Sequence, residues 1–188
     1  MLEIDTDDNV YPPSDDSLLL VKAADKARGE VLDLCAGTGI IGINAAKYAQ
    51  KVTFAEINPM ALKLIEHNAR INNLSNIEIV RSDLFSELGE RKFDVIFVNP
   101  PYLPGTMNST DFLDLATIGG EKGNETTIKI IKDLSKHLKE GGEAFIVVST
   151  ASDLDEVFNT IESLNMKYEI VDSKSYFFEE LKLIRIYR

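Results

Sequence analysis

The sequence predicts a three-layer α/β protein with a doubly wound, mostly parallel seven-stranded sheet that ends in an antiparallel hairpin. Short apolar runs typical of buried strands alternate with helical patterns, as in repeated βαβ units. The last two apolar runs, 167–173 and 181–187, leave no room for a helix between them and are expected to pair antiparallel. A length of 188 residues fits one domain over residues 1–188.

The elements of the first half follow from local signals. Ser14 or Asp15 can cap a first helix, and a glycine-rich turn after the first strand leads into a second one. Pro59 suits the first turn of a third helix, where its missing N–H costs nothing. We expect these helices over residues 16–27, 39–48 and 59–72, and strands over 31–34, 52–56 and 77–81.

The second half begins with a strongly apolar run at 93–98, which is typical of a buried strand in a parallel sheet. A segment at 103–122 without a clear periodic pattern follows this strand. Gly141 and Gly142 are expected to end the helix that comes next. We expect helices over 125–139 and 153–164, and a strand over 144–149.

The composition is that of an acidic globular protein. Hydrophobic residues make up 44% of the chain, but no apolar run approaches the ~20 residues of a membrane span, and no secretory signal is visible. A single cysteine precludes an intramolecular disulfide and favours a reducing compartment, so we expect a cytoplasmic location. The net charge of −11, without any block of basic residues, disfavours tight binding to nucleic-acid phosphates.

Glycines and acidic residues gather where the first three strands end. The glycines, which let the backbone approach a ligand closely, are Gly37, Gly39 and Gly42. Their spacing matches a dinucleotide fingerprint, but Asp33 at the strand end would repel a pyrophosphate and attract an ammonium group. The three carboxylates at successive strand ends, Asp33, Glu56 and Asp83, suit a ligand with a ribose diol, an exocyclic amine and positive charge. S-adenosylmethionine has all three.

Simpler explanations exist for several of these residues. An isolated acid at a strand end is commonly a helix cap, and Asp83 could cap the next turn together with Ser82. Cys35 is expected to be a small packed residue, because no histidine lies near it in the sequence. His67 and His137 lie in charge-rich helical stretches, so we expect both to face solvent and neither to act as a general base. No Cys/His cluster has the spacing of metal ligands.

A rigid polar motif follows the strand at 93–98. It consists of Asn99, Pro100, Pro101 and Tyr102. The prolines stiffen the turn and carry no N–H groups. If the Asn99 side-chain oxygen and the Pro100 carbonyl accept the two N–H bonds of a planar nitrogen, the lone pair of that nitrogen is directed toward a methyl donor. Tyr102 would stack on the planar group and exclude water. The proton can leave after attack, so no strong base is required.

These motifs together resemble the class I S-adenosylmethionine-dependent methyltransferases, which have a Rossmann-like fold. They are most similar to the HemK-related branch, whose members methylate the side-chain amide of a glutamine in translation release factors. Besides the glycine turn and the Asn-Pro-Pro-Tyr motif, the resemblance is carried by residues 10–17, 56–59, 82–85 and 119–123. The first and last of these segments are similar to the compact archaeal and eukaryotic members. The Asn-Pro-Pro-Tyr motif itself is shared with adenine and cytosine methyltransferases.

The resemblance implies a role for each site residue. Asp16 and Ser17 would lie near the methionine end of the cofactor, and Asp33 would bind its amino group. Glu56 would bind the ribose hydroxyls, and Asp83 would bind the adenine amine. The other expected cofactor contacts are Cys35, Ala36, Gly37, Gly39, Ile57, Leu84 and Asn99. The expected catalytic residues are Asn99, Pro100 and Tyr102, and Pro101 completes the substrate site.

The sequence departs from the family at two positions. Cys35, followed by Ala36, stands where the family has the first glycine of its turn, so the backbone approach there is altered. Pro12 stands where many relatives carry an acid, which leaves that position without an assigned role. Residues 1–28 as a whole are expected to form an arm and a helix that pack over the cofactor site.

Three functions remain in consideration. The first is methylation of a glutamine side chain in a release factor, for which the resemblance also implies a small zinc-binding activator. The second is methylation of adenine N6, cytosine N4 or guanine N2 in rRNA, tRNA or DNA, which a basic surface would favour. The third is a silent cofactor-binding scaffold, which the complete acceptor motif opposes. The segment 103–122, with its apolar residues Met107, Phe112, Leu113 and Leu115, is expected to be a substrate-contacting lid rather than a connector.

Overall fold

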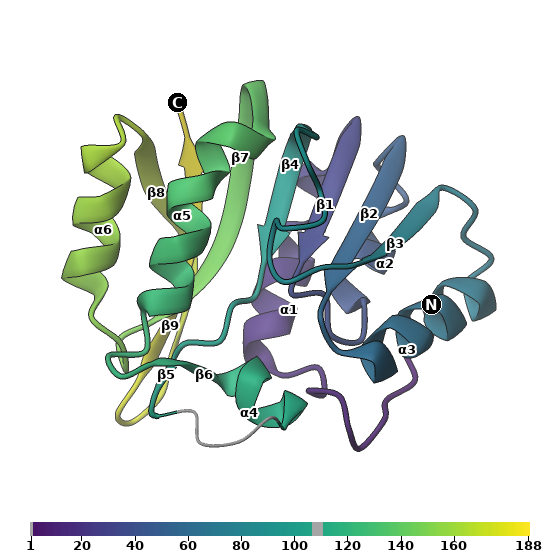
Figure 1. The fold of residues 1–188 in the computed structure, drawn as a ribbon, viewed down its shortest axis with the longest axis horizontal. Helices are drawn as coiled ribbons and strands as arrows, with labels where there is room; N and C mark the ends of the chain where they lie inside the picture. The colour runs from purple at the N-terminus through teal and green to yellow at the C-terminus, as the bar shows by residue number, and fades with distance from the viewer. Residues whose placement is uncertain (1, 107–110) are drawn as a thin grey trace.

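The computed structural model describes residues 2–106 and 111–188, which fold around one large sheet between two layers of helices (Figure 1). The seven strands in spatial order are β3 (Ile77–Arg81), β2 (Lys51–Glu56), β1 (Glu30–Leu34), β4 (Phe93–Val98), β7 (Leu138–Ser149), β9 (Glu180–Tyr187) and β8 (Lys167–Ser175). Neighbours pair in parallel, except that β9 runs antiparallel to both β7 and β8. The predicted fold class and its C-terminal hairpin are confirmed.

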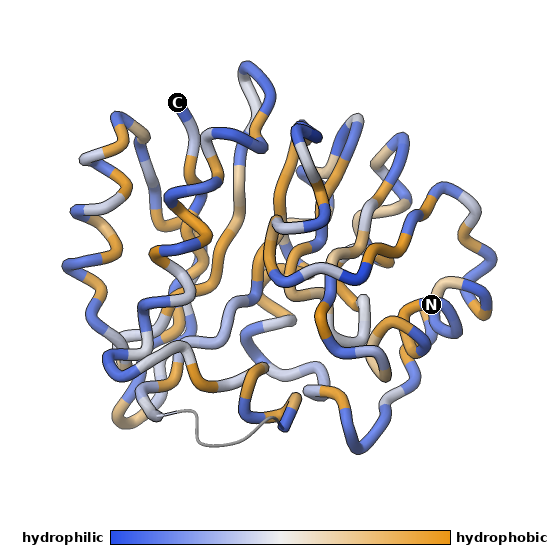
Figure 2. The backbone as a smooth tube through the Cα atoms, in the orientation of Figure 1, coloured by the Kyte–Doolittle hydropathy of each residue, from blue (hydrophilic) through white to orange (hydrophobic). Residues whose placement is uncertain are grey.

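Helices cover both faces of the sheet. One face carries α1 (Asp15–Lys22), α2 (Ile40–Ala45) and α3 (Pro59–Ile71), and the other carries α5 (Glu125–His137) and α6 (Leu154–Ser163). A hydrophobic core lies on each face of the sheet, and alternate residues of β4 contribute to the two cores. Val95 and Phe97 pack toward α1, α2 and α3, whereas Ile96 and Val98 pack toward α5 and α6. Apolar residues therefore run continuously along the central strands (Figure 2), as expected when both faces of a sheet are buried.

Helix starts follow the predicted signals, whereas the first two helices end three or more residues earlier than predicted. The Asn58 side-chain oxygen accepts a hydrogen bond from the N–H of Met60 at 2.9 Å, which caps α3. The helix predicted over 16–27 ends at Lys22 and is followed by a 3₁₀ turn, η1 (Ala24–Lys26), because the chain must reverse at Gly29 (φ +56°) to begin β1. The helix predicted over 39–48 likewise ends at Ala45.

The prediction that Gly141 and Gly142 end a helix is wrong. The helix α5 ends at His137, and the next residue, Leu138, already pairs with Phe93 of β4. The two glycines lie inside β7, where the register with β4 shifts. Burial of Leu138 in the core, at 6% exposure, draws the chain into the sheet before the glycines are reached.

The two histidines differ in their surroundings. His137 is buried, contrary to the prediction: its ring stacks on Phe85 at a centroid distance of 4.4 Å, and its Nδ1 lies 2.9 Å from the carbonyl oxygen of Arg91. It lies on the apolar face of α5, which the charge-rich local sequence concealed. His67 is partly exposed, as predicted, with its Nε2 at 2.7 Å from the Asp5 carboxylate.

The segment 103–122 is more ordered than a simple loop. Its described part contains the strand β5 (Leu103–Pro104), the helix α4 (Phe112–Thr117) and the strand β6 (Ile118–Gly120), and the two strands pair in parallel. Met107 lies outside the described residues. Within the described ranges, no helix is both long and apolar enough to cross a membrane.

Candidate active site

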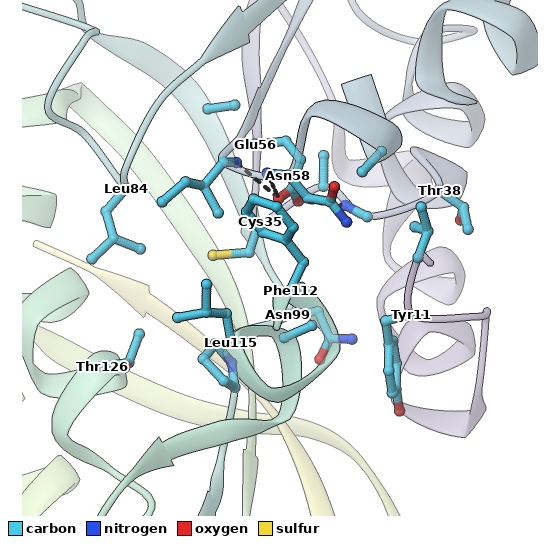
Figure 3. Close-up of a pocket in the computed structure, with 18 of the residues that line it drawn as sticks. Tyr11, Cys35, Thr38, Glu56, Asn58, Leu84, Asn99, Phe112, Leu115 and Thr126 are labelled. Carbon is cyan, nitrogen blue, oxygen red and sulfur yellow. Dashed lines mark hydrogen bonds between the residues drawn. The ribbon is translucent and has the colours of Figure 1, made fainter. Parts of the chain in front are cut away.

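A cleft of about 320 Å³ lies at the carboxyl ends of the parallel strands (Figure 3). It lies where the chain order reverses, because β1 continues to β2 on one side while β4 flanks β1 on the other. Ligands of open α/β sheets bind at this kind of switch point. Segments after β1, β2, β3 and β4 form its walls, and the α4–β6 segment and α5 add to them.

The turn between β1 and α2 forms the floor of the cleft. Cys35, Gly37 and Gly39 all have positive φ angles, of 59°, 54° and 79°. A Cβ atom on Gly37 would have only the carbonyl oxygen of Tyr11 near it, at 3.9 Å, so a side chain there would occupy the cleft. Cys35 adopts the conformation that glycine reaches freely and that costs other residues about 1–2 kcal/mol. A glycine at that position would avoid this cost.

Glu56 fixes this turn to the end of β2. Its Oε2 accepts a hydrogen bond from the N–H of Gly37 at 2.9 Å, and its Oε1 accepts from Ile57 at 2.8 Å and Asn58 at 2.9 Å. The side chain is 9% exposed and lines the cleft. A carboxylate offers about four lone-pair sites, so one remains for a ligand hydroxyl.

Asp33 lies beneath the turn and is not part of the cleft wall. Its Oδ2 accepts a hydrogen bond from the N–H of Gly42 at 2.8 Å, and its Oδ1 is buried without a partner among the described residues. Complete burial raises the pKa of this carboxyl to about 8; the Gly42 hydrogen bond opposes the rise and Glu56 adds to it. The expected contact of Asp33 with the cofactor amino group stays a prediction.

Asp83 and Leu84, which follow β3, line the cleft near Cys35. Burial raises the pKa of the Cys35 thiol far above its usual value, and the charges of Glu56, Asp33 and Asp83 raise it further. The charges of all three predicted acids therefore act on the Cys35 thiol, although only Glu56 and Asp83 line the cleft. The thiol stays protonated, which agrees with its predicted role as a packed residue.

The acceptor motif lies directly after β4, beside the turn that follows β1. Asn99 lines the cleft, and its Oδ1 is buried without a hydrogen-bond partner among the described residues. A buried polar atom without a partner costs about 1–3 kcal/mol, so this oxygen is set up to accept from a ligand. Pro101 also lines the cleft, whereas Pro100 is buried and is not among the lining residues, so the expected contact of its carbonyl with an acceptor nitrogen stays a prediction.

Tyr102 points toward the N-terminal arm. Its hydroxyl donates to Oδ2 of Asp16 at 3.0 Å, and the hydroxyl of Tyr11 donates to the same oxygen at 3.0 Å. The other oxygen, Oδ1 of Asp16, accepts from the N–H and the hydroxyl of Ser17 at 2.5 and 3.1 Å. Tyr102 does not line the cleft, so its stacking role stays a prediction, whereas Tyr11 and Ser17 do line it.

Tyr11 is one of the cleft residues to which sequence reasoning assigned no role; Asn58, Thr126 and Lys129 are others. Burial and the neighbouring Asp16 raise the pKa of Tyr11 to about 12, so its hydroxyl stays a hydrogen-bond donor at neutral pH. Its position in the recognised segment 10–17, five residues before Asp16, was the available signal. Its partner across the site, Tyr102, comes from a distant part of the chain.

The helix α4 and the start of β6 cover one side of the cleft. Phe112, Leu115 and Ile118 line it, which favours the lid over a free connector. The lid is attached to the acceptor motif by glycines: a Cβ on Gly119 would lie 2.5 Å from the carbonyl oxygen of Pro101. A Cβ on Gly123 would lie 2.5 Å from the carbonyl oxygen of Tyr102. Only glycine permits these two approaches.

The residues present fit S-adenosylmethionine. Gly37 leaves room against the backbone, Glu56 retains a free lone pair, and Asn99 presents an unpartnered oxygen. Glu56 and Asp83 both line the cleft, which suits a ligand that carries positive charge. Among the described residues, no group of three or more His, Cys, Asp and Glu side chains is arranged to hold a metal ion.

Comparison with known proteins gives a consistent result. A family model of the methyltransferase small domain matches residues 13–177. A Methanocaldococcus jannaschii protein, provisionally named a protein N5-glutamine methyltransferase, is 40% identical over 95% of this chain and 92% of its own length. The release factor glutamine methyltransferase of Clostridium acetobutylicum is 34% identical over 71% of this chain, which spans only 51% of that enzyme.

Solved structures share the fold. A chain of the E. cuniculi Mtq2–Trm112 complex, responsible for methylation of the termination factor eRF1, has a TM-score of 0.76 at 23% identity. The match covers 96% of this chain and 99% of that chain. A Pyrococcus furiosus methyltransferase has a TM-score of 0.74 at 20% identity, covering 98% of this chain and 88% of its own.

Proposed function

The chain belongs to the methyltransferase small domain family, and we propose that it methylates the side-chain amide nitrogen of a glutamine in a translation release factor. The M. jannaschii relative, similar over nearly the whole of both chains, supports this substrate class. The observation that carries the proposal is the buried, unpartnered Oδ1 of Asn99 at the cleft. The net charge of −11 opposes a nucleic-acid substrate.

The acceptor motif overcomes the weak nucleophilicity of an amide. The amide lone pair is delocalised, so attack requires hydrogen-bond acceptors that favour positive charge on the nitrogen. The Asn99 Oδ1 and the Pro100 carbonyl accept the two N–H bonds and hold the lone pair toward the cofactor site. S-adenosylmethionine, when bound, supplies an electrophilic methyl carbon on positively charged sulfur. Asn99 and Pro100 then stabilise the N–H groups until one proton leaves to solvent.

The cleft floor and the N-terminal arm hold the cofactor in this proposal. Glu56 accepts from one ribose hydroxyl with its remaining lone pair, and Asp83 accepts from the adenine amine. In this proposal Ser17 contacts the methionine end and Asp16 holds Ser17 through two hydrogen bonds, so that residues 1–28 act as a cover over the site; the lining by Tyr11 and Ser17 supports it. Cys35, which lines the floor, contacts the cofactor through its side chain.

A small partner subunit belongs to the same proposal. The E. cuniculi relative of similar fold forms a complex with Trm112. We infer that this chain also acts with a small zinc-binding activator, and that a translation factor as substrate places the reaction in the cytoplasm.

The test offers the protein two classes of acceptor. Purified protein, with and without a Trm112-type partner, is incubated with methyl-labelled S-adenosylmethionine and either a purified release factor or total RNA. We expect label in one glutamine of the release factor, located by mass spectrometry of its peptides. Label confined to RNA overturns the proposed substrate, and no label in either acceptor with the partner present overturns it as well.

A further inference from the structure

The turn between β8 and β9 presents two aromatic side chains to solvent. Phe177 and Phe178 are 91% and 92% exposed, and their rings meet edge to face at a centroid distance of 4.5 Å. Tight turns usually carry Gly, Asn, Asp, Pro or Ser, and neither phenylalanine contributes to a core of this chain. The fold gives no reason for aromatic residues here.

The turn is held in place by polar contacts on both sides. The N–H of Tyr176 donates to the carbonyl oxygen of Glu179 at 2.6 Å, which closes the turn. Ser149 at the end of β7 donates to the Glu179 carboxylate at 2.5 Å, and the hydroxyl of Tyr176 donates to the Asp15 carboxylate. These hydrogen bonds hold the turn that carries Phe177 and Phe178 in one conformation, so less conformational entropy is lost when a partner binds.

The turn lies at the catalytic edge of the sheet. Figure 1 shows it at the lower edge of the view, with β5, β6 and α4, and Figure 2 shows hydrophobic colour at its tip. Neighbouring residues of α1 connect it to the acceptor motif, because Asp15 bonds Tyr176 while Asp16 bonds Tyr102. Phe177 and Phe178 therefore lie at the same edge of the sheet as the acceptor motif, and neighbouring residues of α1 contact both segments.

The surface area that Phe177 and Phe178 can bury indicates what kind of molecule binds them. Two phenylalanines bury about 300–500 Å² together, whereas each partner in a stable complex contributes about 800 Å². They are too small to hold a second copy of this chain alone, but they suit the anchor of a larger interface. The rest of that interface must lie on the surface that continues toward the cleft. The net charge of −11 favours a partner with a basic surface.

We propose that Phe177 and Phe178 form the docking anchor for the protein that carries the acceptor glutamine. The inference rests on the proposed function and adds a specificity element outside the cleft. The anchor raises the local concentration of the acceptor side chain without contact with the reacting atoms. It therefore acts on substrate affinity and leaves the chemical step unchanged.

The test compares two surface variants of the complete protein, with any partner subunit that the wild type requires. Phe177→Ser combined with Phe178→Ser removes the anchor, and Tyr48→Ser removes an aromatic residue that is 53% exposed near the start of β2, at the opposite edge. For the double variant, we expect KM for the release factor to rise at least about tenfold. Its kcat and its affinity for S-adenosylmethionine, measured by calorimetry, should match the wild type, and Tyr48→Ser should leave all three values unchanged.

Other outcomes overturn the inference. An unchanged KM in the double variant, with an active wild type, removes the docking role and leaves the proposed function intact. A fall in kcat with weaker cofactor binding shows a structural effect on the site. A wild-type dimer in light scattering that the double variant dissociates assigns the surface to a second copy of the chain. An inactive wild type overturns the proposed function and, with it, this inference.

Discussion

Buried carboxylates have different partners at the two edges of the sheet: the amino edge, where the parallel strands begin, and the carboxyl edge, where they end. At the amino edge, Glu143 is 5% exposed and forms ion pairs with both Arg28 and Arg185. At the carboxyl edge, Asp16 and Glu56 are 2% and 9% exposed. Within the described ranges, their hydrogen bonds come from neutral tyrosine and serine hydroxyls and backbone N–H groups rather than from Lys or Arg.

The difference separates acids that stabilise the fold from acids that serve binding. A buried carboxylate without a counterion is costly, and a paired one is much less so. At the carboxyl edge the missing positive charge can come from a cationic ligand, whereas at the amino edge arginines supply it permanently. The pKa of Asp33, raised to about 8 by burial and by Glu56, reflects the same absence of a cation.

The largest effect is expected at the acceptor motif. Asn99→Ala removes the oxygen that has no partner in the protein, so we expect turnover to fall ~10²–10³-fold, as for loss of one preorganised polar group. Cofactor affinity, measured by calorimetry, should fall far less than turnover, because Asn99 is only one of several expected cofactor contacts. The control is Asn76→Ala before β3, whose side chain donates to two backbone carbonyls at 3.0 and 3.1 Å. It should lower stability and spare turnover; near-normal turnover of Asn99→Ala would contradict the assigned chemistry.

The amino edge should show the reverse pattern. Glu143→Ala removes a carboxylate that two arginines share; Arg185 keeps its ion pair with Glu169 at 2.9 Å. Loss of one member of a buried pair costs about 3–5 kcal/mol. Because the Arg28 and Arg185 side chains are 50% and 37% exposed, we expect a loss nearer 2–3 kcal/mol in the free energy of unfolding. Urea denaturation measures it, and turnover per folded molecule should not change. A variant that unfolds normally but has lost activity would remove the distinction between the edges.

The protonation state of the buried Asp33 should be visible in how the free energy of unfolding changes with pH. In the unfolded chain Asp33 has an ordinary pKa near 3.8, whereas in the folded state it is about 8. Between these values only the folded state keeps the proton, so stability is greatest at low pH and falls as pH rises, by up to about 1.4 kcal/mol per unit. Asp33→Asn should remove this slope, which denaturation at pH 6 and pH 7 measures. Equal slopes in both proteins would show that Asp33 is already ionised.

The contrast between edges also shows what the sequence alone could predict. The strand ends, the register of Asp33, Glu56 and Asp83, and the acceptor motif were predictable, because parallel strands bring their carboxyl ends to one edge. Strand periodicity and the conformational freedom of glycine depend on residues that are close in the sequence, so both can be recognised from the sequence alone. The contact between Tyr11, Asp16 and Tyr102 was not predictable, because it joins residues that are 86 positions apart.

Local signals failed where tertiary packing overrode them. Gly141 and Gly142 looked like a helix stop, but burial of Leu138 ended the helix first. His137 was expected in solvent because its neighbours are charged, yet stacking on Phe85 buries it. In both cases the competing interaction comes from another element of the fold, so no local pattern could reveal it.

The smallest expected effect tests whether neutral donors hold the carboxyl edge together. Tyr102→Phe removes one of two hydroxyls that donate to Oδ2 of Asp16, at a cost of about 1 kcal/mol, or about 2–4 °C in Tm. Tyr11→Phe should cost a similar amount, and the double variant should cost more than the sum of the two, because Oδ2 of Asp16 then has no donor.

The salt dependence separates the two edges. Because the tyrosine donors are uncharged, 1 M salt should leave the effects of Tyr102→Phe and Tyr11→Phe unchanged, while it weakens the effect of Glu143→Ala. Thermal denaturation at two salt concentrations measures both, and an equal salt response at the two edges would show that the carboxyl edge also depends on ion pairs.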